Sequence, residues 1–128
     1  MNKTIFTFGS NEAGMHGAGA AAIAHRDFGA VYGRGYGHYG ESFAIPTKDM
    51  NIESLEIAKI KKYVDGFLAY AHAQRKLVFQ VTRIGCGLAG FTDRAIAPLF
   101  AEATKNCEFD LAWQPFLGED RIYWGTYG

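Results

Sequence analysis

The apolar and polar positions of the chain form short strand-like runs that alternate with longer helix-like segments. Ile5, Phe6 and Phe8 lie among β-branched residues and predict a buried strand that begins near Thr4. Leu77–Ile84, with the sequence LVFQVTRI, predicts a second clear strand. Shorter strands are predicted at Ser42–Thr47, Asp110–Phe116 and Arg121–Thr126.

Three other segments have the residue pattern of helices. An alanine-dense run predicts a helix over Gly17–Asp27, with Gly29 as the residue that ends it. Apolar residues recur every three or four positions over about Ile52–Gln74, which predicts an amphipathic helix. Thr92 is a candidate N-cap for a third helix over about Asp93–Lys105.

Strands that alternate with helices predict an α/β fold with a mixed, mostly parallel central sheet. The length of 128 residues and the apolar content of 48% predict one domain that covers residues 1–128. In such sheets, ligands bind beyond the carboxyl ends of the strands. The glycine-rich loops at 9–19 and 85–90 each follow a predicted strand. We therefore expect both loops at the same edge of the sheet.

Charge and composition narrow the range of partners. Thirteen Lys and Arg residues balance thirteen Asp and Glu residues, so we expect no groove that captures nucleic acid by charge. No apolar run approaches the roughly 18 residues of a membrane span, and the N-terminal sequence lacks a signal-peptide pattern. Cys86 and Cys107 are too few for a disulfide framework, which predicts a reduced, cytoplasmic protein. The oligomeric state is not predicted.

The first glycine-rich loop, which contains Gly9, Gly14, Gly17 and Gly19, lies between a predicted strand and a predicted helix. Glycine allows backbone N–H groups to approach a ligand closely, and the first helical turn has unpaired amides with partial positive charge. This arrangement predicts a cradle for a phosphate-bearing small molecule.

Two stretches match the pattern G-x-G-x-x-G. The stretch at 35–40 precedes a strand and therefore lacks the context of a dinucleotide-binding loop. The stretch at 85–90 lies between a strand and a helix, and Asp110 follows at the spacing of a ribose-binding acid. The 38 residues after Gly90 are too few for the second half of a dinucleotide fold. We expect a loop that wraps a diphosphate, and no P-loop motif GK[ST] occurs.

Several side chains have two open interpretations. His16 lies inside the first glycine loop and is either a loop tether or a catalytic group. Asp49 is either a turn residue or a catalytic group, and Arg34 and Arg83 are either solvated, paired, or in contact with phosphate. A helix N-terminus lowers the pKa of a nearby cysteine, but a small buried role is the alternative for Cys86. The histidines have no partners at metal-ligand spacing, so we expect no metal site.

Three stretches together resemble the macrodomain family, whose members bind ADP-ribose. They are residues 8–24 (FGSNEAGMHGAGAAAIA), residues 41–47 (ESFAIPT) and residues 78–91 (VFQVTRIGCGLAGF). The resemblance implies a macrodomain-like three-layer α/β/α fold and a short, divergent member of bacterial or phage type. The strand with the family's Gly-Asp-Ile motif has no counterpart before the first strand, so the resemblance identifies no aspartate for adenine.

The resemblance also assigns residues to the ligand. Asn11 matches the family asparagine near the distal ribose, and Phe91 matches the aromatic residue beside that ribose. The implied ligand-binding set is Ser10, Asn11, Gly17, Ala18, Gly19, Gly85, Cys86, Gly87, Leu88, Ala89, Gly90 and Phe91.

Three functions stay open at this point. The first is hydrolysis of an ADP-ribosyl bond, in which Asn11 orients the ribose and His16 or Asp49 activates water. The second is a non-catalytic reader or sponge for an ADP-ribose-type signalling nucleotide. The third is a structural or assembly protein that keeps the fold without the pocket. None of them requires a cofactor.

Overall fold

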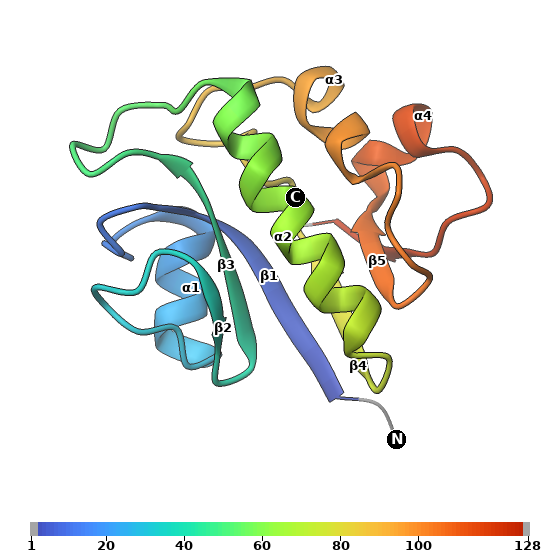
Figure 1. Ribbon diagram of the computed structural model, residues 1–128, viewed down its shortest axis with the longest axis horizontal. Coiled ribbons are helices and arrows are strands. Elements are labelled where there is room, and N and C mark those ends of the chain that lie inside the picture. Colours follow the sequence, from blue (N-terminus) through green and yellow to red (C-terminus); the bar gives the residue numbers. More distant parts are fainter. Residues whose placement is uncertain (1–2, 127–128) are drawn as a thin grey trace.

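The computed structural model describes residues 3–126, which form a six-stranded sheet with helices on both faces (Figure 1). The strands follow the order β2-β3-β1-β4-β5-β6. Their bounds are β1 Lys3–Asn11, β2 Gly37–Tyr39, β3 Ser42–Lys48, β4 Leu77–Val81, β5 Cys107–Asp110 and β6 Tyr123–Gly125. β2 is antiparallel to β3, and the other neighbouring pairs are parallel. The predicted mixed, mostly parallel α/β sheet is confirmed.

The helices lie on both faces of the sheet. They are α1 Gly19–Asp27, α2 Ile57–Ala73, α3 Asp93–Ile96 and α4 Gln114–Leu117, with short 3-10 helices at Ala97–Phe100 and Leu111–Trp113. In Figure 1, α1 lies behind the sheet and α2 lies in front of it. Gly29 follows the end of α1 with a φ of +80°, as predicted for the residue that ends this helix.

Two apolar clusters hold these layers together. The larger cluster lies under α2 and α3, where Phe67, Phe79 and Trp113 are fully buried. The smaller cluster lies under α1, where Phe6 and Phe8 pack among alanines. The small alanine side chains let α1 approach the sheet closely, because they add little bulk between the helix and the phenylalanine rings.

The path of the chain places the carboxyl end of β1 at a switch point. From β1 the chain passes through α1 to β3, on one side of β1. It then returns through α2 to β4, on the other side of β1. A crevice opens where consecutive connections leave a strand toward opposite sides, and ligands bind there in open α/β sheets.

Near the C-terminus, the strand predicted over Arg121–Thr126 is confirmed as β6, whereas the strand predicted over Asp110–Phe116 is wrong. β5 covers Cys107–Asp110 and shares only Asp110 with that prediction, because a 3-10 turn and α4 occupy the residues that follow. The Asp110 carboxylate accepts the amide of Ala112 at 2.9 Å, and this cap turns the chain out of the strand. Pro115 lies in the first turn of α4, a position that proline favours in helices and that has no place in a central strand.

Other boundaries also differ from the predictions. The helix predicted over Asp93–Lys105 is α3 followed by a 3-10 turn, with Pro98 in the first positions of that turn. The Thr92 cap is confirmed, because its hydroxyl accepts the amide of Ala95 at 3.2 Å. α2 begins only at Ile57, because Ile52 has a φ of +62° within a preceding turn.

In residues 3–126, no helix is long and apolar enough to span a membrane.

Candidate functional site

A cleft of about 610 Å³ opens at the carboxyl ends of the central strands. It is lined by residues 9–11, 15, 17–21, 32, 47–48, 52, 82–89 and 110. The volume lies within the range of small-molecule sites in proteins, about 300–1,000 Å³. Both glycine-rich loops therefore border one cavity, at the position that the strand order predicts for a ligand.

The two loops approach each other at two points. A Cβ atom built on Gly9 would lie 3.3 Å from the backbone nitrogen of Gly85, which is closer than most real Cβ contacts. A Cβ atom built on Gly19 would lie 3.7 Å from Cδ1 of Leu88, so the Leu88 side chain reaches across to the start of α1. The predicted convergence of loops 9–19 and 85–90 is confirmed.

The N-terminus of α1 presents unpaired amides to this cleft. Ala18 is the N-cap residue, and its side chain makes no capping hydrogen bond. The first backbone bond to its carbonyl comes from Ala22, at 3.2 Å. The amides of Gly19, Ala20 and Ala21 have no acceptor among residues 3–126, and all three residues line the cleft. The positive end of the helix dipole thus faces the cavity.

The loop at 85–90 supplies a second set of donors. Gly90 donates to the carbonyl of Gly87 at 3.0 Å, a bond that closes the loop. Within the described chain, the amides of Gly87, Leu88 and Ala89 have no acceptor. The hydroxyl of Ser54 donates to the Ala89 carbonyl at 2.8 Å and fixes the loop from outside. The loop is therefore held in place with its amides unsatisfied.

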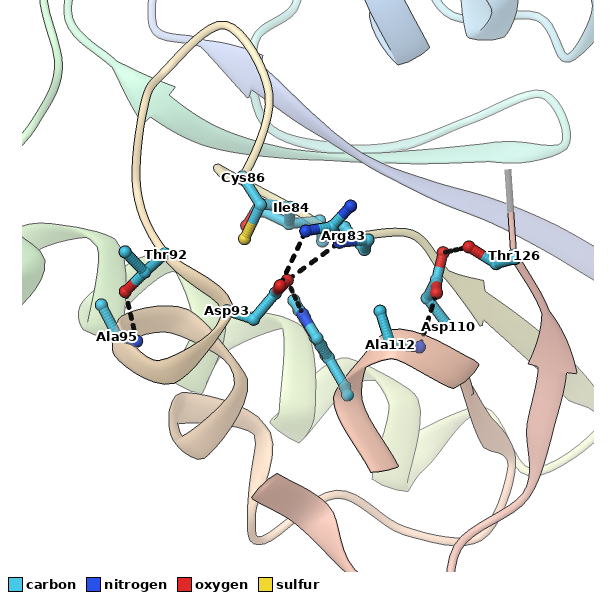
Figure 2. Close-up of polar contacts among 10 residues, drawn as sticks. Arg83, Ile84, Cys86, Thr92, Asp93, Ala95, Asp110, Ala112 and Thr126 are labelled. Atoms are coloured by element: carbon cyan, nitrogen blue, oxygen red, sulfur yellow. Dashed lines mark hydrogen bonds and ion pairs between the residues drawn. The ribbon is translucent and has the colours of Figure 1, made fainter. Parts of the chain in front are cut away.

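Two cationic side chains border the cavity. Arg83 pairs with both carboxylate oxygens of Asp93, at 2.9 and 2.7 Å, and its third nitrogen points away from Asp93 (Figure 2). This guanidinium holds the pKa of the Asp93 carboxyl below its ordinary value. Lys48 lines the cleft and has no ion-pair partner among residues 3–126. Of the two predicted phosphate-binding arginines, Arg34 does not line the cleft.

Asn11 and Ser10 lie on the floor of the cleft. The Asn11 amide group donates to the Met15 carbonyl at 2.8 Å and accepts the Met15 amide at 2.9 Å. The Ser10 hydroxyl donates to the Asn11 carbonyl at 3.2 Å. Asn11 therefore fixes the first glycine loop and has only part of its hydrogen-bonding capacity left for a ligand.

The two side chains predicted to activate water lie outside the cleft. His16 is 1% exposed, and its Nε2 contacts the Val31 carbonyl at 3.0 Å. Oδ1 of Asp49 accepts the amides of Asn51 and Glu53 at 2.8 and 3.0 Å. Neither His16 nor Asp49 lines the cavity. These positions favour the loop-tether interpretation of His16 and the turn interpretation of Asp49, and they do not support a catalytic role for either residue.

Cys86 lines the cleft, but its thiol is not activated. Burial, followed by the nearby Asp93 carboxylate, raises the pKa of the Cys86 thiol to about 12. The possibility that the helix N-terminus lowers this pKa is therefore wrong, because desolvation dominates. Gly90 and Phe91 end the second loop but do not line the cavity, and Phe91 packs against the larger apolar cluster.

The cleft also contains residues outside the predicted ligand-binding set. They are Met15, Tyr32, Thr47, Lys48, Ile52, Thr82, Ile84 and Asp110, together with Ala20 and Ala21 of α1. Most of them have no motif, and they reach the cleft only because the strand ends meet there. Asp110 had a signal in its spacing from the second glycine loop, but it was not assigned to the site.

Residues 3–126 contain no group of three or more His, Cys, Asp or Glu side chains that could hold a metal ion. No protein-family model, no curated protein and no solved structure matches this chain.

Proposed function

We propose that the cleft binds ADP-ribose or a related ADP-ribosyl nucleotide. The observation that carries this proposal is the pair of unsatisfied amide sets, at the start of α1 and in loop 85–90, that border one cavity. A diphosphate satisfies both sets at once, because it has two anionic groups and oxygens on several sides. Backbone amides and a helix dipole are common protein ligands for phosphate.

The rest of the lining supports a ligand larger than free pyrophosphate. Lys48 and Arg83 add positive charge beside the amides. The exposed side chains of Met15, Ile52 and Leu88 supply apolar surface at the mouth of the cleft. A nucleotide combines an anionic centre with less polar arms and fits such a lining. The ADP-ribosyl identity rests on the resemblance of the two loops to those of macrodomains.

Among the open functions, the geometry favours a non-catalytic reader. A hydrolase needs a general base within hydrogen-bond reach of the attacking water. His16 and Asp49 are outside the cavity, and the pKa of the Cys86 thiol is about 12. The cleft therefore has many groups that hold a diphosphate and lacks the predicted groups that activate water.

Calorimetric titration with ADP-ribose, ADP, AMP and ribose 5-phosphate tests the proposal. We expect ADP-ribose to bind at micromolar concentrations, ADP to bind more weakly, and ligands with a single phosphate to bind weakest. Absence of binding by ADP-ribose to the parent chain would contradict the proposal.

A pair of substitutions at Ala18 tests the position of the diphosphate. Ala18→Asp caps α1 and should raise the free energy of unfolding by about 1 kcal/mol. It also introduces a carboxylate where the phosphate is expected, so we expect a loss of binding. Ala18→Ser provides a similar cap without charge and should weaken binding much less. Equal affinities of the parent and Ala18→Asp would contradict this position.

A further inference from the structure

Asp110 is a buried carboxylate at one end of the cleft, and it has the spacing of a ribose-binding acid from the second glycine loop, but the predicted ligand-binding set does not include it. It ends β5, is 2% exposed and lines the cavity. Thr82 and Arg83 line the same end of the cleft. Only a group that enters this end of the cavity can reach the carboxylate.

The hydrogen bonds of Asp110 leave part of the acceptor capacity of its carboxylate unused. Oδ1 accepts the amide of Ala112 at 2.9 Å, and Oδ2 accepts the hydroxyl of Thr126 at 3.1 Å (Figure 2). A carboxylate offers about four acceptor positions, so about two are left. Arg83 lies nearby but pairs with Asp93, and no cation forms an ion pair with Asp110 within residues 3–126. The carboxylate is thus suited to hydroxyl or amine donors of a ligand.

The sheet register places Asp110 beside the strand that leads into the second glycine loop. β4 and β5 are parallel neighbours, with Val81 opposite Phe109. The next residues, Thr82 and Asp110, are therefore level with each other, and the loop begins three residues after Thr82. Neighbouring parallel strands lie about 4.8 Å apart. A sugar attached to a phosphate on the loop amides can therefore reach the end of β5.

The unit of β4, glycine loop, α3 and β5 has the order of a mononucleotide-binding half of a dinucleotide fold. In such units, an acidic residue near the end of the second strand accepts hydrogen bonds from ribose hydroxyls. Two adjacent hydroxyls match the two oxygens of one carboxylate. A 2′-deoxy sugar lacks one of these donors, and a 2′-phosphate brings a second negative charge against the carboxylate.

We propose that Asp110 accepts hydrogen bonds from the adenosine ribose hydroxyls and makes the cleft selective for the ribonucleotide. This inference rests on the proposed function, in which the distal ribose lies near Asn11 and leaves the adenosine arm for the β4–β5 end. Asp110 acts as a specificity-determining residue.

The test measures affinities for ADP-ribose and for two analogues, one with 2′-deoxyadenosine and one with a deoxygenated distal ribose. In the parent chain, we expect the 2′-deoxyadenosine analogue to bind at least about tenfold more weakly, as for a lost hydrogen bond to a charged group. In Asp110→Asn, the side-chain oxygen can still cap Ala112. The ratio of the affinity for ADP-ribose to that for the 2′-deoxyadenosine analogue should fall below about threefold in this variant. The ratio for the distal analogue should be the same in both proteins.

Thr126→Val serves as the matched control, because it removes a partner of Asp110 and leaves the carboxylate in place. It should retain the tenfold ratio. If Asp110 has a purely structural role, Asp110→Asn changes the affinities for all three ligands by the same factor. The ratios between these affinities then stay as in the parent chain, and that result overturns the inference. A change in the ratio of the affinities for ADP-ribose and the distal analogue in Asp110→Asn also overturns it. If the parent binds ADP-ribose without preference for the ribonucleotide, only this inference fails, whereas absence of all binding overturns the proposed function as well.

Discussion

Gly9 and Gly85 lie in close backbone contact, so that a Cβ atom on Gly9 would be 3.3 Å from the Gly85 nitrogen. Gly9 belongs to β1, and Gly85 opens the second glycine loop. A side chain at position 9 would push the loop away from the strand end. The spacing between the two amide sets of the cleft therefore depends on the absence of one methyl group.

Gly9→Ala should destabilise the protein and weaken ligand binding. The added methyl would lie 3.3 Å from the Gly85 nitrogen and 3.6 Å from Cγ2 of Ile84, and overpacking of this kind costs about 1–3 kcal/mol. Urea unfolding measures the stability, and titration with ADP-ribose measures the affinity.

Gly87→Ala is the matched control for this substitution, because a Cβ atom at position 87 meets nothing within 4 Å. Its stability should be unchanged or higher by up to about 1 kcal/mol, since alanine restricts the unfolded chain. If Gly9→Ala is as stable as Gly87→Ala, the loop at 85–90 moves away from the added methyl group without a loss of stability, which contradicts the prediction.

Ile52→Gly should stabilise the protein and weaken binding. A β-branched residue with a φ of +62° is strained, and the left-handed conformation costs about 1–2 kcal/mol for a residue with a Cβ atom. Glycine removes this strain, and part of the gain is offset by its larger entropy in the unfolded chain. Ile52 also lines the cleft, so its loss removes apolar contact with the ligand. We expect a net gain of up to about 1 kcal/mol in urea unfolding.

Ile122→Gly provides the comparison, because Ile122 is similarly exposed, lies outside the cleft and has no positive φ. It should lose about 0.5–1 kcal/mol and keep its affinity for ADP-ribose. The strain argument fails if both isoleucine variants lose the same stability.

His16 should make the stability depend on pH near neutrality. Burial lowers the pKa of the His16 imidazole in the folded protein below its ordinary value of about 6.5. The unfolded state then binds more protons below pH 6.5, so stability is present above that pH and falls as the pH drops toward the folded pKa. Nδ1 of His16 has no hydrogen-bond partner among residues 3–126, and the effect of burial on the pKa outweighs the opposing effect of the Val31 and Arg34 backbone groups.

Urea unfolding between pH 7.5 and 5.5 measures this dependence. His16→Gln should be less stable at pH 7.5, because it loses ring packing, but its stability should change less with pH. Equal slopes in the parent and His16→Gln would contradict the assignment of the titration to His16.

The fold is predictable from the sequence where one local signal dominates. Ile5 and Phe79 lie in apolar runs that form β1 and β4, as predicted. The strand prediction after Asp110 is wrong because the apolar residues of this short 3-10 turn resemble those of a strand. Trp113 is fully buried in that turn, and only the Asp110 cap and Pro115 indicate that the chain leaves the sheet. Short turns carry too few residues to show a period.

The sequence also predicts only part of the site. The glycine loops have a local sequence signature, and their convergence follows from parallel strands. The direction of the His16 ring depends on Val31, fifteen positions away in sequence, and no local pattern encodes that contact. Lys48 and Thr82 reach the cleft only through the alignment of β3 and β4 with β1. Such tertiary neighbours are not visible in one sequence.

Asp93→Asn should reduce the loss of stability in acid. The hydrogen bonds from Arg83, followed by that from Trp113, lower the pKa of the Asp93 carboxyl in the folded protein. A carboxyl group with a lowered folded pKa stabilises the fold above its unfolded pKa of about 3.9, and this contribution is lost as the pH falls through the folded pKa. Because the Arg83 side chain is 43% exposed, solvent screens the pair, and we expect Asp93→Asn to cost about 1 kcal/mol at pH 7.

The measurement is urea unfolding at several pH values from 7 to 2.5. Asn retains an acceptor for the Trp113 indole, so the difference between the parent and Asp93→Asn should come from the charge and should shrink below about pH 4. Asp65→Asn removes an exposed ion pair with Lys61 and should change stability by less than about 0.5 kcal/mol at pH 7. A constant difference between the parent and Asp93→Asn at all pH values would mean that shape, and not charge, links Asp93 to Arg83. In that case Arg83 would be free to leave Asp93 for a phosphate without an electrostatic penalty, so the acid titration also tests how firmly this guanidinium is held at the edge of the cleft.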